Sequence, residues 1–149
     1  MSLINVLNED IKKAMKAKDK PTLAVLRMLK SAIQNEQINK GQPLTADEEL
    51  TVLAREMKQR KDSLESFTQA GRDDLVEQVK AEIVVVETYM PKQLTETELS
   101  TILSEVIQQV GATSMKDFGK VMGAAMPKVK GKADGNQVQS LVKQLLKTT

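Results

Sequence analysis

The sequence predicts an all-α protein, in which an N-terminal helical-hairpin bundle is followed by a small three-helix C-terminal module. Three observations support this fold class. Apolar residues recur at intervals of three and four along seven segments, which is the spacing of helices with one buried face. Aromatic residues are scarce among the 149 residues, with two Phe, one Tyr and no Trp, so the core depends on Leu, Ile, Val, Ala and eight Met. Such residues suit packed helices better than a sheet sandwich. The third observation is Pro91, which interrupts the helical spacing and separates the predicted bundle from the predicted module.

The first two segments are predicted to form a helical hairpin. The first begins after Ser2 and carries these apolar positions: Ile4, Leu7, Ile11, Ala14 and Met15. The second begins at Asp19-Lys20-Pro21, because proline is favoured in the first turn of a helix, and it continues to about residue 39. Gly41-Gln42-Pro43 then predicts a loop.

Two further helices are predicted before the break. Thr45 and Glu48 have the spacing of a capping box, which opens a long helix that continues to Ala70, with Gly71 as the residue after its end. Apolar residues of the next segment extend to Met90. Its run 83–86 would favour a strand if taken alone, because it is rich in β-branched residues, but the wider spacing favours a helix.

The boundary between two domains is placed at Tyr89-Met90-Pro91-Lys92, because Pro91 disfavours helical geometry in the residue before it. Domains are therefore predicted at 1–91 and 92–149. A second capping box, Thr95 with Glu98, opens the smaller domain. Three helices are expected in it: one after Thr95 that ends at Gly111, one after a Ser114 cap, and one after Asp134.

Composition excludes several kinds of catalytic site. The chain has no His and no Cys, so disulfides, Cys/His zinc sites, thiolate nucleophiles and Ser-His-Asp triads are excluded. Neither a carboxylate cluster suited to a metal nor a glycine-rich nucleotide loop is evident. We therefore predict no catalytic residue, no cofactor and no metal site. No apolar run approaches the ~20 residues that span a bilayer, and no secretory signal is evident, so a cytoplasmic chain is expected.

Positive charge concentrates in the last quarter of the chain. Residues 112–149 contain seven Lys against Asp117 and Asp134, a balance of +5. Lys128, Lys130 and Lys132 alternate with Val129 and Gly131, beyond a proline that is expected to end a helix. In an extended and flexible segment the three ammonium groups would form one row, which suits a phosphate backbone. A solvated loop would explain the same charges, and the absence of interleaved aromatic residues leaves only phosphate and shape recognition.

Other positions allow two interpretations each. Gly119 and Gly123 share a helix face, which indicates either a close helix crossing or a flat surface for a partner. Arg60 lies beside an apolar stripe and could follow it to the surface or pair with a carboxylate of the next helix. Arg27 could form an ion pair or contact a phosphate. Tyr89 is interpreted as a packing residue rather than an acid.

Six stretches carry a resemblance to a known family. They are Leu26–Ile33, Lys58–Ser63, Ala70–Leu75, Glu87–Leu94, Met115–Gly123 and Met126–Gly135. Together they resemble the GatB/YqeY family, in its YqeY branch, over nearly the whole chain. In the tRNA-dependent amidotransferases of this family the related module is the tail of the B subunit, which contacts tRNA, while the catalytic parts lie elsewhere.

The resemblance implies a non-catalytic module that binds tRNA or another structured RNA, with no evident specificity for DNA. The expected contacts are Lys116, Gly119, Lys120, Gly123, Lys128, Lys130, Gly131 and Lys132. Secondary basic contacts are expected at Arg27, Lys58 and Arg60. The family label also implies a carbon–nitrogen ligase reaction with glutamine as amide donor, so an accessory role in amidation is one alternative. A module that binds an amidotransferase or another translation-related protein is a second.

Overall fold

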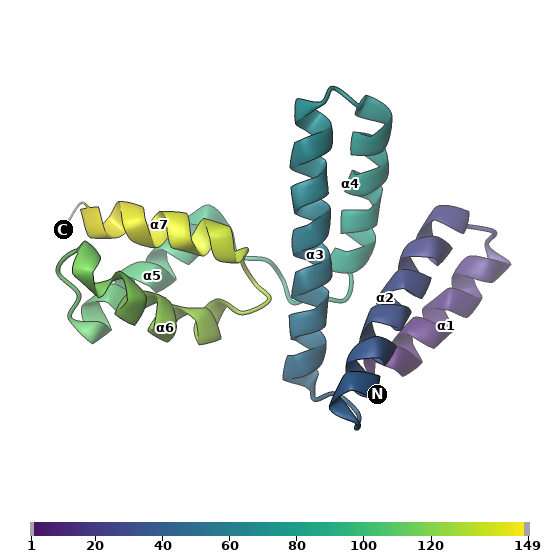
Figure 1. Cartoon of the computed structure of the whole chain (residues 1–149), viewed down its shortest axis with the longest axis horizontal. Helices are drawn as coiled ribbons and strands as arrows, with labels where there is room; N and C mark the ends of the chain where they lie inside the picture. The colour runs from purple at the N-terminus through teal and green to yellow at the C-terminus, as the bar shows by residue number, and fades with distance from the viewer. Residues whose placement is uncertain (1, 148–149) are drawn as a thin grey trace. The chain divides into compact units, whose positions relative to one another are not determined.

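In a computed structural model that describes residues 2–147, helices joined by short loops make up the chain (Figure 1). These residues form seven α-helices and one short 3₁₀ helix, and they contain no strand. The all-α prediction is therefore confirmed. The chain divides into two compact units, one that ends at Met90 and one that begins at Pro91. No helix between residues 2 and 147 is long and apolar enough to cross a membrane.

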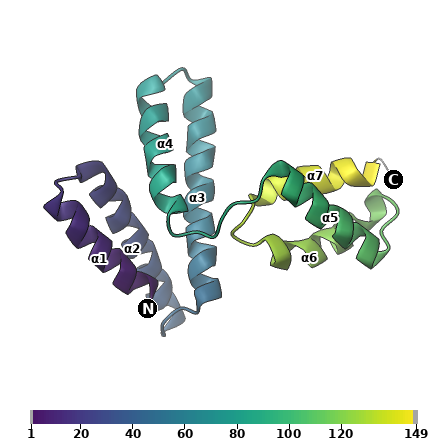
Figure 2. The same cartoon turned by 180° about the vertical axis from the view of Figure 1, so that it is seen from behind.

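The N-terminal unit consists of two helical hairpins, visible from both sides in Figures 1 and 2. Its helices are α1 (Leu3–Lys16), α2 (Lys20–Lys40), α3 (Ala46–Gln69) and α4 (Asp73–Glu87). Local sequence sets their ends. Ser2 accepts a hydrogen bond from the backbone of Asn5, and Thr45 and Glu48 form the predicted capping box. The run 83–86 is helical, and Gly71 has a φ of +70° where the chain reverses into α4.

The core of the N-terminal unit lies where α2 packs against α1, α3 and α4. Its buried side chains come from all four helices: Leu7, Ala14, Val25, Leu26, Leu29, Leu53, Met57 and Val86. The hydroxyl of Tyr89 donates a hydrogen bond to Asp10 Oδ2 at 2.5 Å, which ties the segment after α4 to α1. Burial, with the carboxylate of Asp10 as a further cause, raises the pKa of Tyr89. Tyr89 thus acts as a packing residue within this unit.

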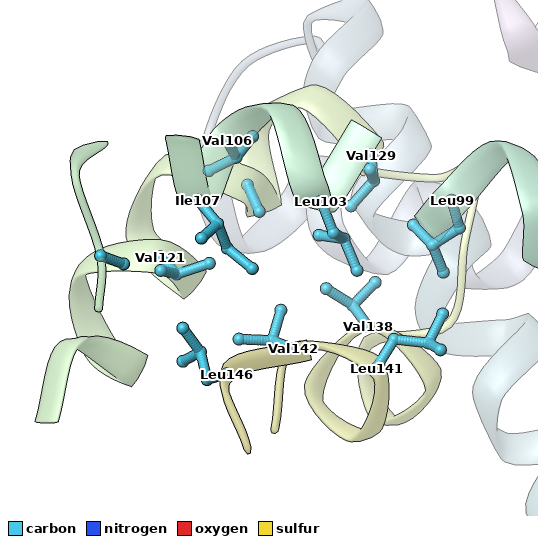
Figure 3. Packing of buried hydrophobic residues seen from close by; sticks show 12 residues of the cluster. Leu99, Leu103, Val106, Ile107, Val121, Val129, Val138, Leu141, Val142 and Leu146 are labelled. Atoms are coloured by element: carbon cyan, nitrogen blue, oxygen red, sulfur yellow. The ribbon is translucent and has the colours of Figure 1, made fainter. Parts of the chain in front are cut away.

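The C-terminal unit has a separate core between three helices. They are α5 (Glu96–Val110), α6 (Phe118–Val129) and α7 (Gly135–Lys147), with the 3₁₀ helix η1 (Met115–Asp117) before α6. Figure 3 shows the buried side chains of the three helices pointing toward one another. Leu103 of α5, Val129 of α6 and Val142 of α7 are fully buried. The second capping box, Thr95 with Glu98, opens α5 as predicted.

The proline expected to end a helix lies inside α6 instead. Pro127 is followed by Lys128 and Val129 before the helix ends. Pro127 has no N–H to donate to the carbonyl of Gly123, and its ring crowds that carbonyl, so the helix continues past it at a cost. The complete burial of Val129 in the core favours the helical continuation. Lys128 is therefore a helical residue and not part of an extended segment.

Candidate nucleic-acid interface

The exposed side of α6 carries very little side chain. Gly119, Gly123 and Pro127 follow one another at intervals of four and are all exposed, whereas Val121 and Ala125 on the opposite side are buried. Lys116, at the start of this stripe, and Lys120, beside it, are exposed as well. We call these five exposed residues, from Lys116 to Pro127, the α6 face.

The two glycines of the α6 face do not mediate a helix crossing within the described part of the chain. A Cβ atom built on Gly119 or on Gly123 meets no heavy atom within 4 Å, apart from chain neighbours and the helix's own backbone. Both glycines also have ordinary helical backbone angles, because neither has a positive φ. The expectation of a close crossing is therefore wrong, and the stripe stays open to a partner.

The residues after α6 form a tight turn instead of an extended row. Lys130 has φ −55° and ψ 125°, and Gly131 has a φ of +75°. The Lys132 N–H donates a 2.8 Å hydrogen bond to the carbonyl of Val129. These features define a type II β-turn, which requires a residue such as glycine at its third position. Gly131 is buried, so it shapes the turn from inside and is not a surface contact.

The segment before α5 holds this turn in place. Gln93 Nε2 donates a 2.8 Å hydrogen bond to the carbonyl of Gly131 and a 3.0 Å hydrogen bond to that of Pro91. The N–H of Leu94 donates a 2.8 Å hydrogen bond to the carbonyl of Lys132. The expectation of a flexible loop is therefore wrong, since two successive carbonyls of the turn are anchored to a segment almost forty residues earlier.

The lysines predicted to bind RNA are distributed over two ends of α6. Lys116 and Lys120 lie at its start, and Lys128, Lys130 and Lys132 lie at its end and in the turn. Lys130 is half-buried and the other four are exposed. Lys128 Nζ donates a 3.1 Å hydrogen bond to Gln109 Oε1 on α5, which holds its side chain toward that helix.

The acidic groups of the C-terminal unit are outnumbered by its lysines, and three of its five acids lie on α5. Asp117 accepts a 2.9 Å hydrogen bond from the N–H of Thr113, and Asp134 accepts a 3.0 Å hydrogen bond from that of Asn136. The remaining acids, Glu96, Glu98 and Glu105, all belong to α5, which contains no Lys or Arg. Apart from Lys92, the lysines of this unit therefore lie on η1, α6, the turn and α7.

Sequence reasoning did not include two lysines of α7 among the contacts. Lys143 Nζ lies 5.6 Å from the centre of the Phe118 ring, a cation–π distance. This contact brings the second half of α7 beside the start of α6, where Lys116 and Lys120 lie. Lys147, one turn further along α7, is also exposed. Both lysines were among the seven counted in residues 112–149. Their number was therefore evident from the sequence, but the position of Lys143 beside the start of α6 follows only from the antiparallel packing of α6 and α7.

The predicted secondary contacts lie in the N-terminal unit, and one of them is inaccessible. Arg27 and Lys58 are exposed, and Lys58 Nζ pairs with Asp62 Oδ2 at 3.2 Å. Arg60 is only 5% exposed, so its interpretation as an RNA contact is wrong. Its Nη1 donates to Glu56 Oε2 at 2.8 Å, and its Nε lies 3.2 Å from Glu82 Oε1 in an ion pair that lacks hydrogen-bond geometry. Arg60 is thus the bridge from α3 to a carboxylate of α4.

Comparison with known proteins decides the family. The family described as Yqey-like protein matches residues 4–146. The chain belongs to the YqeY-like family. In the described residues of this YqeY-like chain, no group of three or more acidic side chains is placed to hold a metal ion.

Fungal relatives of this YqeY-like chain share the name Altered inheritance of mitochondria protein 41, mitochondrial. The protein from Pyrenophora tritici-repentis is 29% identical over 94% of this chain and 78% of its own length. The protein from Lachancea thermotolerans is 34% identical over 81% of this chain and 69% of its own. The protein from Kluyveromyces lactis is 31% identical over 83% and 71%. Their names place those proteins in mitochondria, and the cytoplasmic location of this chain stays a prediction.

Proposed function

We propose that this YqeY-like chain binds tRNA, or another structured RNA, through the α6 face and the lysines beside it. The observation that carries the proposal is the combination of an open, side-chain-poor stripe with lysines at both ends of the same helix. Membership of the YqeY-like family supports it. So does the resemblance of the motifs Met115–Gly123 and Met126–Gly135 to the tRNA-contacting tail of the amidotransferase B subunit.

The chemistry of this surface favours recognition of shape over recognition of bases. The C-terminal unit contains no Trp and no Tyr. Its one Phe, Phe118, is half-buried beneath Lys143. A platform for base stacking is therefore not offered. Ammonium groups near a flat helix surface suit the phosphates and 2′-hydroxyls that double-helical RNA presents along its shallow minor groove. In this proposal Gly119 and Gly123 admit the RNA backbone, and the lysines neutralise phosphates.

A salt titration tests this proposal. Affinity for a fluorescently labelled tRNA is measured by anisotropy between about 50 and about 200 mM salt, and log K is plotted against log salt concentration. Each phosphate contact adds about 0.9 to the slope, by the value for double-helical DNA. The double variant Lys116→Ala/Lys120→Ala is expected to lose affinity and to lower the slope by about 1.8.

A matched control variant is available on α1. Lys12 and Lys16 are exposed and four residues apart, as Lys116 and Lys120 are. Lys12→Ala/Lys16→Ala removes the same charge and should leave both affinity and slope unchanged. An affinity that does not respond to salt, or equal effects of the two double variants, would exclude the α6 face as the binding surface. A duplex DNA competitor at the same concentration tests the preference for RNA.

A further inference from the structure

A second surface, on the N-terminal unit, is open and has the opposite charge. Two adjoining hollows lie between α2 and α4, with volumes of about 160 and 350 Å³, and both are lined by Thr22 and Val85. The larger hollow also reaches the end of α1. We call the two hollows together the α2–α4 groove; its two helices can be followed in Figure 1.

The walls of the α2–α4 groove are mainly apolar. Ala24 and Met28 line it from α2, and Ala81 and Val84 line it from α4. Met28 is 52% exposed and Val84 is 63% exposed, although side chains of this kind are stabilised by about 1.5–3 kcal/mol when fully buried. Large apolar side chains gathered along an open hollow are typical of a surface that a partner covers.

The rim of the α2–α4 groove is acidic. Asp10, Asp19 and Glu82 line it against the single ammonium group of Lys13, so three negative charges oppose one positive charge and leave −2. The guanidinium of Arg60 behind Glu82 does not change this balance, because it is also paired with the carboxylate of Glu56. Among the residues that line the hollows, this balance favours a cationic partner over an RNA backbone. The exposed Lys16, Lys18 and Lys20 lie beside the groove and are not part of its lining.

We propose that the α2–α4 groove binds an amphipathic helix of a partner protein, whose apolar stripe is flanked by Lys or Arg. The walls are long enough to contact about two turns of a helix, since the lining positions 21, 24 and 28 of α2 and 78, 81 and 85 of α4 extend over about 10 Å of helix axis. Apolar side chains of the partner enter the hollows, and its basic residues face Asp10, Asp19 and Glu82, in the helix-in-groove mode of recognition.

The test uses a defined probe with the full chain. A synthetic helix of Leu and Lys, with one Leu face, is titrated into isotope-labelled protein while amide shifts are recorded. A peptide with Glu in place of every Lys is the matched probe. The Lys peptide is expected to shift the amides of Ala24, Ala81 and Val84, more weakly at high salt, while the Glu peptide leaves them in place. Shifts confined to other surfaces, equal binding of both peptides, or no binding would overturn the proposal.

Two variants locate the interaction. Val84→Lys adds positive charge at an exposed groove position, whereas Ile38→Lys makes the same kind of change at a 75% exposed residue that does not line the groove. Val84→Lys should weaken binding of the Lys peptide at least tenfold and Ile38→Lys should not, with tRNA affinity the same in both. Equal weakening would contradict the proposal. Self-association that Val84→Lys abolishes would also contradict it, since the occupant would then be a second copy of this chain.

Discussion

Replacing Gly123 by alanine separates the two effects of a glycine in the middle of α6. In the free protein the substitution should stabilise. The new Cβ meets nothing within 4 Å, Gly123 has an ordinary helical φ, and it stands well inside the helix. Alanine is therefore favoured over glycine by about 0.5–1 kcal/mol. For a domain of this size that gain raises the midpoint of thermal unfolding by about 2–8 °C.

In the complex the same methyl group should be unfavourable. It stands on the α6 face, where we propose that an RNA backbone approaches the helix directly. Gly123→Ala is expected to weaken tRNA binding several-fold, and the larger Gly123→Leu at least tenfold, which corresponds to about 1.4 kcal/mol. A variant that is more stable yet binds less tightly cannot be explained by damage to the fold.

Thermal unfolding followed by circular dichroism and tRNA anisotropy at one salt concentration measure the two effects. Gly135→Ala is the control, because Gly135 is an exposed glycine at the first position of α7, without a positive φ or a neighbour within 4 Å of its Cβ. If Gly123→Ala and Gly123→Leu bind tRNA as tightly as the unchanged protein, the α6 face is not a contact surface. If Gly123→Ala destabilises the protein, the reasoning about the open stripe is wrong.

Two further predictions concern the stability of the N-terminal unit. Arg60→Ala leaves the carboxylates of Glu56 and Glu82 without their shared partner and should lower the free energy of unfolding in urea by about 3–5 kcal/mol. The triple variant Arg60→Met/Glu56→Gln/Glu82→Gln should recover most of this stability. A loss below about 1 kcal/mol for Arg60→Ala would contradict the buried bridge. The second is a pH dependence: a hydrogen bond from Lys40, with a further one from Thr45, lowers the pKa of Glu48 from 4.5 to about 2. As the pH falls, Glu48 is therefore protonated in the unfolded chain before it is protonated in the folded protein. The stability that Glu48 contributes is complete above about pH 4.5 and is lost as the pH falls toward 2. When the free energy of unfolding in urea is measured across this pH range, Glu48→Gln should lose less stability toward low pH than the unchanged protein does. An equal loss in both proteins would refute the role given to Glu48.

The all-α fold was predictable because its determinants are local. Helical spacing, two capping boxes and the glycine at 71 depend on residues within a few positions of one another, and each acts as expected. The run 83–86 shows the same point, since its β-branched residues yield to the helical period around them. Both Thr45 and Thr95 could be identified as caps without any knowledge of tertiary contacts.

The details of the candidate interface were less predictable because they depend on packing. Burial of Val129 extends α6 past Pro127, and this converts the expected row of lysines into a helix end followed by a turn. Gly131 signals a turn in the sequence, but its anchoring by Gln93 does not, since these residues are 38 positions apart. The position of Lys143 beside Phe118 depends likewise on the pairing of α6 with α7.

The pairing of residues 93 and 94 with the turn at 131 and 132 determines where the C-terminal unit can be excised. A fragment that begins at the Thr95 cap retains every helix and all of the buried core, but it loses the hydrogen bonds to the carbonyls of Gly131 and Lys132. A fragment that begins at Pro91 retains them. The segment that resembles a connector is thus part of the smaller unit. Transplanting this unit into another protein therefore requires the four residues before the cap as well as the three helices.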